Sequence, residues 1–240
     1  MSKVIPKRLN KEIEYAKSAA MEDQGIFYEY DDTDLMSGNA MIIGPQDTPY
    51  EGCLLCFAIS YPGDYPFSSP TVRITTSDGV TRFHPNLYVE GKVCLSILGT
   101  WSGPKWAPAM SISTVLTTIR SILDPNPIAN EPGYERLTLE DSDHRAKDYA
   151  ELVRFRLVSH TIRGLHAWKM GALPAAWAPF KDILDVQGDM FIKNLTRIIE
   201  RESAKSDVFY PSVVYRMSGT AGWKSLVQIS DALKLREGKP

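Results

Sequence analysis

The chain contains three cysteines and four histidines, the side chains best suited to nucleophilic or proton-transfer chemistry. A thiol has a pKa of roughly 8.5, so some thiolate is present at neutral pH without a dedicated base. Cys94 comes shortly after the tripeptide His84, Pro85 and Asn86, in the segment FHPNLYVEGKVCLSIL at residues 83–98. A lone cysteine is more often a small buried hydrophobic residue. Its position after a Gly-containing turn favours a nucleophile at Cys94.

Cys53 and Cys56 form a C-x-x-C pair, a pattern that can indicate metal or redox chemistry. Residues three apart on a strand point to opposite faces, and no second pair completes four zinc ligands. His160 and His166 are six residues apart, whereas two ligands on one helix face are three or four apart. We predict core packing for the two cysteines and no metal site.

Length and composition are those of an ordinary globular protein of one or two domains, with 240 residues of which 43% are hydrophobic and 23% charged. The formal net charge of −2 provides no general attraction to nucleic acid or to an anionic membrane. No apolar run is long enough to span a membrane, and the first residues lack the apolar run of a secretory signal. Three cysteines are too few, and odd in number, for a disulfide framework. We expect a reducing location, cytoplasmic and/or nuclear, with no nucleic-acid or membrane partner.

The helices and strands around residues 83–98 are predicted from periodicity and turn residues. Helical spacing predicts an amphipathic helix with a basic outer face between Pro6 and Met21. Between residues 26 and 76, four short β-rich runs alternate with turn-rich segments and predict a four-stranded antiparallel meander. Residues 82–110 are too rich in Gly, Pro and Asn for long elements and predict a structured loop. Ser111 is placed to cap an amphipathic helix that follows.

The C-terminal part is predicted to be mainly helical. A helix is expected from about Glu135 to beyond Ile162, after which two glycines and two prolines interrupt the pattern. A second amphipathic helix is expected from Phe180 to Glu202. Residues 208–235 predict a short extended piece followed by a helix. The fold class is therefore α+β with a mainly helical extension.

The segment at residues 83–98 closely resembles the active-site signature of ubiquitin-conjugating enzymes. Four other phrases occur in the family's order: TPYEG, YPGDYPFSSP, a Trp followed by Ala-Pro-Ala, and DPNP. The long loop CLSILGTWSGPKWAPA, with NEPGYE and SHTIRG, is similar to the Z-type subfamily. This resemblance implies a ubiquitin-conjugating (UBC) fold over residues 1–164, followed by an extension over residues 165–240.

The resemblance also implies the chemistry. Cys94 would accept the C-terminal glycine of ubiquitin or a ubiquitin-like protein as a thioester from an activating enzyme, without a cofactor. It would then transfer the modifier to a substrate lysine or to a ubiquitin ligase. Asn86 would donate to the oxyanion or brace the loop, and the family allows both roles. His84, next to Pro85, is expected to be structural, and Ser96 stands where many relatives have aspartate.

The group that orients or deprotonates the lysine is the least defined. The family often has an acidic or polar residue two positions after the Asn-Pro pair, and here that position is Ala129. Asp124, Asn130 or Glu131 could substitute if the loop bends suitably. Ala129 and Ser96 keep a non-catalytic ubiquitin-binding variant of the fold as an alternative. A cysteine hydrolase is a further alternative, although no clear Cys-His-acid set is present.

Partner surfaces follow from the resemblance alone. The first helix would meet the activating enzyme through Lys7, Arg8 and Lys11, although a solvated helix face explains these residues equally well. Phe67, Trp106 and Pro108 would form a ligase-docking surface, unless the aromatic rings are core plugs. Residues 165–240 would select the activating enzyme, modifier or ligase, or would serve as a stabilising cap.

Overall fold

A four-stranded antiparallel sheet lies at the centre of the computed structural model, which describes residues 7–30, 34 and 36–235. The strands are neighbours in chain order: β1 (Ile26–Tyr30), β2 (Ser37–Ile43), β3 (Leu54–Ser60) and β4 (Thr71–Ile74). In the register, Met41 of β2 lies between Phe27 of β1 and Cys56 of β3. The predicted meander is confirmed.

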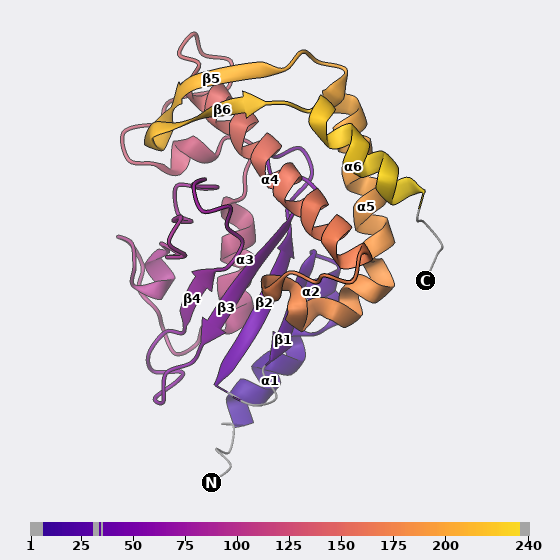
Figure 1. Cartoon of the computed structure of the whole chain (residues 1–240). Coiled ribbons are helices and arrows are strands. Elements are labelled where there is room, and N and C mark those ends of the chain that lie inside the picture. Colours follow the sequence, from indigo (N-terminus) through magenta and orange to yellow (C-terminus); the bar gives the residue numbers. More distant parts are fainter. Residues whose placement is uncertain (1–6, 31–33, 35, 236–240) are drawn as a thin grey trace.

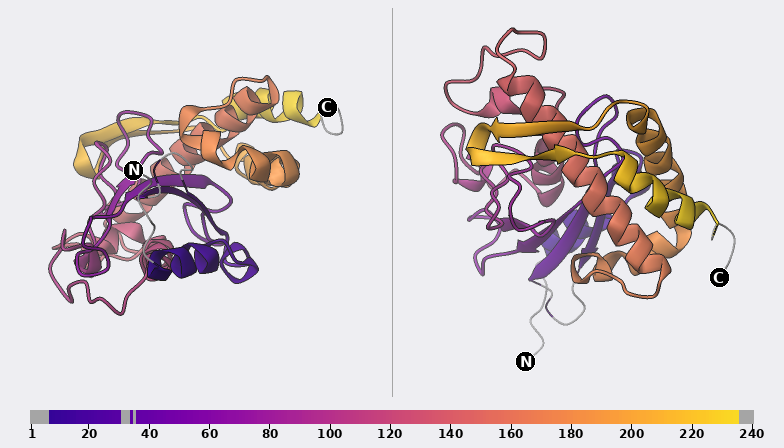
Figure 2. Two further views of the ribbon diagram at one scale, coloured as in Figure 1. Left: turned by 90° about the horizontal axis from the view of Figure 1, so that it is seen from below. Right: turned by 45° about the horizontal axis from the view of Figure 1, so that its top comes forward.

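Helices cover both faces of this sheet (Figures 1 and 2). On one face lie α1 (Lys7–Ala16) and α3 (Ile112–Ile122), which contact each other. The other face is crossed by α4 (Arg145–Lys169), and α5 (Lys181–Ser203) packs beside α4. Short 3-10 helices connect these elements: η1 (Ser96–Leu98), η2 (Pro127–Asn130) and η3 (Ala175–Phe180).

The N-terminal helix is shorter than the spacing predicts. Its apolar stripe, Leu9, Ile13 and Ala16, is buried as expected for helical periodicity. Ser18 then adopts an extended conformation (φ −78°, ψ 155°), and the chain resumes as α2 (Ala19–Glu22). The predicted single helix is therefore two helices within the described residues, and the predicted start at Pro6 lies outside them.

The helix after the active-site loop begins where the sequence predicts. The Ser111 hydroxyl accepts the backbone N–H of Thr114, and the Thr114 hydroxyl accepts the backbone N–H of Ser111. This capping box satisfies donors that a helix start leaves unpaired. It fixes the point at which the preceding loop must end.

The expected helix from Glu135 is wrong over its first ten positions, because α4 begins only at Arg145. Aspartate side chains bind the backbone instead: Asp141 accepts the N–H of Thr138, and Asp143 accepts the N–H of Arg145. Such local bonds compete with helix formation. Residues 135–144 are therefore a connection between η2 and α4.

Gly164 does not weaken α4, which runs continuously through it to Lys169. A Cβ at this position would lie 2.5 Å from the ring of Trp177, so only glycine admits the tryptophan. Trp177 is buried at 1% exposure and fastens η3 to α4. The proposed domain boundary at residue 164 stays a prediction, and it falls inside this helix.

The C-terminal segment contains a hairpin that the sequence did not predict. Instead of one extended piece, β5 (Val208–Val213) and β6 (Met217–Ala221) pair antiparallel across the 3-10 turn η4 (Val214–Arg216). The helix α6 (Lys224–Lys234) follows as expected. At the turn, Tyr215 and Arg216 have φ values of 62° and 57°, which usually require glycine or asparagine. The usual hairpin signal is therefore missing from the sequence.

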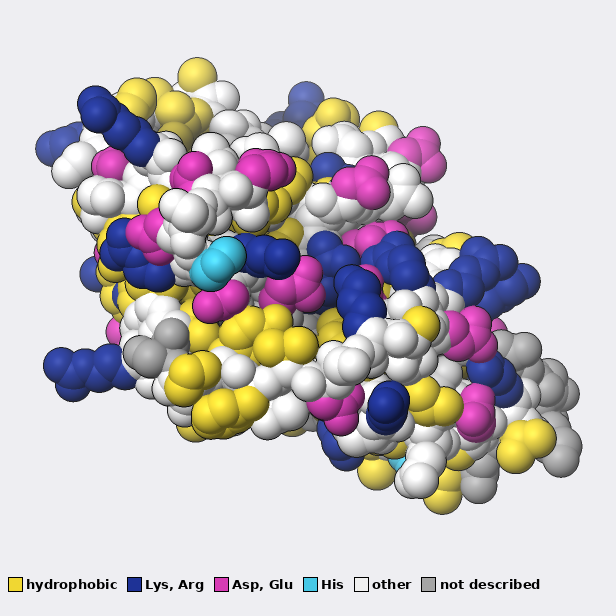
Figure 3. Space-filling view, turned by 90° about the horizontal axis from the view of Figure 1, so that it is seen from above, with side chains coloured by type: hydrophobic (Ala, Val, Ile, Leu, Met, Phe, Trp, Pro, Cys, Tyr) yellow, Lys and Arg dark blue, Asp and Glu magenta, His cyan; other side chains and the backbone are white. Residues whose placement is uncertain are grey.

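The extension shares one hydrophobic core with the rest of the chain. Buried residues of α1, the sheet, α4, α5 and α6 form a single continuous cluster. Viewed from the side of the hairpin, Lys and Arg side chains are interleaved with Asp and Glu side chains (Figure 3). Over the described residues, no helix combines the length and apolar character needed to cross a membrane.

Candidate active site

Cys94 and Asn86 are held together by reciprocal hydrogen bonds. The backbone N–H of Cys94 donates to the Asn86 carbonyl oxygen at 2.8 Å. The Asn86 side chain donates from Nδ2 to the Cys94 carbonyl oxygen at 2.6 Å, while its Oδ1 has no hydrogen-bond partner among the residues that the structure describes. An amide nitrogen must face that carbonyl, so the amide orientation is determined by its partner. Nδ2 has a second N–H for another acceptor.

Reactive cysteines are usually partly exposed, whereas Cys94 has only 1% exposure. The loop that follows folds back onto the chain on both sides of Cys94. The Thr100 hydroxyl donates to the Val93 carbonyl at 2.8 Å and accepts the Leu95 N–H at 2.9 Å. Cys94 is nevertheless outside the continuous hydrophobic cluster to which both other cysteines belong.

Ser96 lies at the start of η1 and is half-buried. The loop after η1 returns to it, since a Cβ at Gly103 would lie 3.0 Å from the Ser96 Cβ. Gly103 has a φ of 129°, which favours glycine. The loop that distinguishes the Z-type pattern is therefore packed against the segment that carries Cys94.

His84 is buried in the turn beside Asn86. It is fully buried, and its Nδ1 accepts the backbone N–H of Asn86 at 3.0 Å. Burial lowers its pKa from 6.5 to about 3, so the ring is neutral and its Nδ1 is engaged. A buried ring with this pKa is a poor general base, which argues against the hydrolase alternative.

Side chains from other elements fix the backbone before this turn. The Tyr50 hydroxyl donates to the Phe83 carbonyl at 2.9 Å, and the Tyr149 hydroxyl of α4 donates to the Arg82 carbonyl at 2.8 Å. The Arg82 guanidinium in turn donates from Nε to the carbonyl of Pro85 at 3.2 Å. The His-Pro-Asn turn is thus anchored to two elements far away in the sequence.

The loop between α3 and η2 brings two candidate residues together. The Asp124 carboxylate accepts the Asn126 backbone N–H and the Asn130 side chain, each at 2.9 Å. Asn130 also donates to the Pro127 carbonyl at 3.2 Å. The bend that would let Asp124 and Asn130 act together is therefore present, and Ala129 lies within it.

Glu131 is engaged elsewhere. Its Oε2 accepts the Tyr215 hydroxyl at 2.6 Å and lies 3.8 Å from the Arg82 guanidinium. It is the partner of a side chain from the C-terminal hairpin. Of the three acid or amide substitutes for Ala129, Asp124 and Asn130 form one pair and Glu131 belongs to another cluster.

The two remaining cysteines pack in the core. Cys53 and Cys56 have 0% and 1% exposure, and burial raises the pKa of each thiol to about 12. No disulfide joins them. Among the described residues, no group of three His, Cys, Asp or Glu side chains could hold a metal ion.

The three basic residues of α1 differ in their surroundings. Lys7 and Lys11 are exposed. Arg8 pairs with Glu12 at 2.7 Å and donates to the Met110 carbonyl at 2.8 Å, so it helps attach α1 to the end of the active-site loop.

The two loops of the predicted docking surface lie next to each other. The Trp106 indole donates to the Pro66 carbonyl at 2.7 Å, joining the Ala-Pro-Ala turn to the loop that carries Phe67. Phe67 is 77% exposed and Pro108 is exposed, whereas Trp106 is half-buried. Phe67 is therefore not a core plug.

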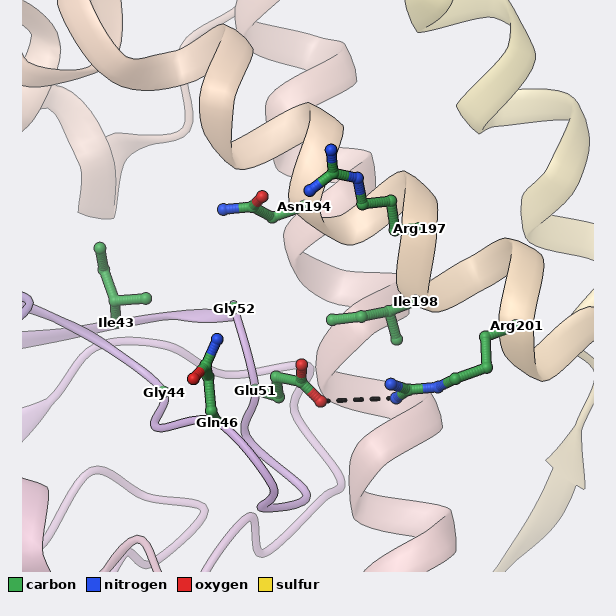
Figure 4. Close-up of a pocket in the computed structure, with 9 residues that line it drawn as sticks. All are labelled: Ile43, Gly44, Gln46, Glu51, Gly52, Asn194, Arg197, Ile198 and Arg201. Carbon is green, nitrogen blue, oxygen red and sulfur yellow. Dashed lines mark hydrogen bonds and ion pairs between the residues drawn. The ribbon is translucent and has the colours of Figure 1, made fainter.

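A separate cavity of about 420 Å³ lies between the β2–β3 connection and α5 (Figure 4). Its walls are joined by an ion pair of Arg201 with Glu51 at 3.4 Å. Arg197 and Asn194 of α5 also line it. None of the candidate site residues lines this cavity, so it is distinct from the Cys94 site.

Sequence reasoning missed three residues that position the site, Arg82, Tyr149 and Tyr215. Arg82 immediately precedes the signature segment and carried no signal of its own. Tyr149 falls within the helix predicted from about Glu135 and was indistinguishable from a core residue. Tyr215 lies more than a hundred residues from Cys94, and only the fold brings it near Arg82.

The fold and this cysteine–asparagine turn are those of a ubiquitin-conjugating domain. The family model described as "Ubiquitin-conjugating enzyme" matches residues 8–157, more than half of the chain. The chain therefore belongs to the ubiquitin-conjugating enzyme family.

Curated relatives place it near the Z type. Ubiquitin-conjugating enzyme E2 Z of Danio rerio is 43% identical over 155 residues, covering 64% of this chain and 46% of that protein. The Homo sapiens E2 Z is 47% identical over 135 residues, covering 56% of this chain and 37% of that protein. The predicted resemblance to the Z-type subfamily is confirmed, and the alignments span less than half the length of these relatives.

A solved structure of a Toxoplasma gondii ubiquitin conjugating enzyme E2 domain is also similar. It is 28% identical and covers 64% of this chain and 94% of that domain, with a TM-score of 0.46.

Proposed function

We propose that the protein accepts the C-terminal glycine of ubiquitin or a ubiquitin-like protein as a thioester on Cys94. The donor is an activating enzyme, and the acceptor is a substrate lysine or the thiol of a ligase. The observation that carries this proposal is the reciprocal pairing of Cys94 with Asn86 inside the family's signature segment. The position of Cys94 outside the hydrophobic cluster, unlike the other two cysteines, also supports it.

In the transfer step, the neutral lysine amine attacks the thioester carbonyl carbon. A carbon–nitrogen bond forms, the carbon–sulfur bond breaks, the Cys94 thiolate leaves, and the proton lost by the amine passes to solvent water. The carbonyl oxygen becomes negative in between, and the second N–H of Asn86 Nδ2 is the donor we assign to it. The first N–H remains on the Cys94 carbonyl and fixes the direction of the amide.

Access to the sulfur requires movement, because Cys94 is only 1% exposed. We assign that movement to the loop at residues 99–105, which Thr100 and Gly103 attach to the Cys94 segment. Residues Thr100 to Lys105 of this loop are exposed, and Thr100 forms hydrogen bonds with the Cys94 segment. Few buried groups therefore oppose displacement of the loop.

The Asp124–Asn130 pair is our candidate for orienting the lysine amine. A free lysine has a pKa of about 10.4, so an acceptor that binds the ammonium and then the amine favours attack near neutral pH. Asp124 is half-buried and its carboxylate already accepts two N–H groups. Glu131 is not assigned this role because Tyr215 binds its carboxylate.

Partner contacts are proposed on two surfaces. Lys7 and Lys11 of α1 are available to the activating enzyme, while Arg8 contributes by fixing α1 to Met110. Phe67 and Pro108, joined through Trp106, are proposed to dock the ligase.

The test is a charging reaction with activating enzyme, ATP and a panel of modifiers. A reductant-sensitive adduct on Cys94 is expected with at least one modifier, and it should discharge to free lysine. A wild-type protein that binds ubiquitin without forming any adduct would instead identify the non-catalytic variant. Release of free ubiquitin from conjugates without ATP would identify the hydrolase.

A further inference from the structure

The closed end of the β5–β6 hairpin reaches the loops on either side of α3, after crossing α4 (Figures 1 and 2). Tyr215 lies in this end and makes contacts with both loops. Its ring lies 4.2 Å from the Arg82 guanidinium carbon, and its hydroxyl donates to Glu131 at 2.6 Å. Arg82 comes before the His-Pro-Asn turn, and Glu131 follows η2.

Arg82 transmits this contact to the active-site turn. Its guanidinium also lies 3.8 Å from the ring centre of Tyr88, so two aromatic rings hold it. From this position it donates from Nε to the Pro85 carbonyl at 3.2 Å. Pro85 is bonded directly to Asn86, whose side chain holds Cys94. Removing one ring would free the guanidinium to rotate away from the Pro85 carbonyl.

The hairpin is fixed strongly enough to act as a brace. Tyr215 packs edge-on against Tyr149 of α4 with ring centres 5.8 Å apart. Arg156 of α4 binds the Ser218 carbonyl in β6 and the Thr81 hydroxyl beside Arg82. Tyr215 itself has a φ of 62°, a conformation that non-glycine residues adopt only where the surroundings impose it.

We propose that Tyr215 is a positioning residue for the thioester site: by holding Arg82 and Glu131 together, it fixes the His-Pro-Asn turn and the loop after η2 relative to each other. Only the kinetic consequence of this inference, a change in the rate of discharge, rests on the proposed function. It gives the C-terminal extension a role in catalysis that differs from selecting a partner. A cap that merely stabilises the fold would not need to contact these two loops.

Tyr215→Gly is the sharpest variant, because glycine adopts the positive φ without strain while the ring is lost. We expect the side-chain N–H signals of Asn86 and the amide signal of Cys94 to shift in the NMR spectrum of the full chain. Lysine discharge of the charged enzyme should slow about tenfold, as expected from a small displacement of reacting groups.

Tyr215→Phe is the conservative comparison, since it keeps the ring on Arg82 and loses only the hydroxyl bond to Glu131. Discharge should slow less than in Tyr215→Gly, because the ring on Arg82 is kept and only the link to Glu131 is lost. Tyr210→Ala is the matched control, because Tyr210 is half-buried on β5 and, among the described residues, the rings on the Arg82 guanidinium are those of Tyr88 and Tyr215. It should leave the Asn86 and Cys94 signals unchanged.

A folded Tyr215→Gly protein with unmoved Asn86 and Cys94 signals and wild-type discharge would overturn the proposal. Should that variant fail to fold, Tyr215→Leu fills part of the space without a ring and serves the same comparison. A wild-type protein that never forms a thioester would defeat the proposed function instead. The NMR comparison would still decide whether Tyr215 positions the turn.

Discussion

Replacing Asn86 with alanine separates the two roles that its side chain is proposed to have. The substitution removes the 2.6 Å hydrogen bond to the Cys94 carbonyl and leaves that carbonyl without the side-chain donor. A buried acceptor deprived of its partner costs about 1–3 kcal/mol. For a chain of this length, the melting temperature should fall by about 2–4 °C for each kcal/mol.

The catalytic loss should be larger than the stability loss can explain. A missing oxyanion donor lowers a rate by about 100-fold or more, equivalent to about 3 kcal/mol of transition-state stabilisation. Single-turnover discharge of the charged enzyme to free lysine measures this step without the charging step. Melting of the uncharged protein measures the bracing role separately.

Asn126→Ala is a matched control. The Asn126 side chain also donates from Nδ2 to a backbone carbonyl at 2.6 Å, that of Leu137, and its Oδ1 likewise lacks a partner within the described part of the chain. The two variants should lose similar stability, whereas Asn126→Ala should slow discharge by less than about threefold. Equal slowing in both variants, or no slowing in Asn86→Ala, would refute the assignment of Asn86 to the oxyanion.

Three further predictions concern protonation, packing and thiol access. Because burial lowers the His84 pKa from 6.5 to about 3, its neutral ring stabilises the fold above pH 6.5, and this contribution is lost as the pH falls towards 3. Urea unfolding should therefore show that the free energy of unfolding falls by up to about 1.4 kcal/mol per pH unit between pH 6.5 and 4. His84→Gln should make this pH dependence less steep, and an unchanged slope would contradict the burial argument. Gly164→Ala should lower stability by about 1–3 kcal/mol, because its Cβ would lie 2.5 Å from the Trp177 ring, and an unchanged melting temperature would show that η3 moves freely. Iodoacetamide at pH 8 should label Cys94 before Cys53 and Cys56, because those two cysteines belong to the hydrophobic cluster and are exposed only when the core opens. Mass spectrometry of the native protein measures the order of labelling. Simultaneous labelling would mean that Cys94 also needs global unfolding.

The regular part of the conjugating domain was predictable because local signals agree with the fold. The four strands alternate with turn residues, and Ser111 caps α3 through a bond that its neighbour three positions on completes. Cys94 and Asn86 could be paired from the signature segment, and His84 could be classed as structural. These inferences need only contacts within a short stretch of chain.

Features that depend on distant contacts were not predictable. Glycine at position 164 normally weakens a helix, but the Trp177 ring compensates for it. The hairpin turn at Tyr215 has the conformation usual for glycine, and contacts with Arg82 and Glu131 hold it. The return of the loop at Gly103 to Ser96 is encoded by no periodicity in the sequence.

The central claim is that Cys94 carries the modifier, and charging of Cys94→Ser beside wild type tests it most directly. Incubation with activating enzyme, ATP and ubiquitin or another modifier should give a wild-type adduct that a thiol reductant removes. The serine variant should give an adduct that resists the reductant, because an oxyester replaces the thioester. Reductant-sensitive charging that persists in Cys94→Ser would place the modifier on another cysteine and contradict the account.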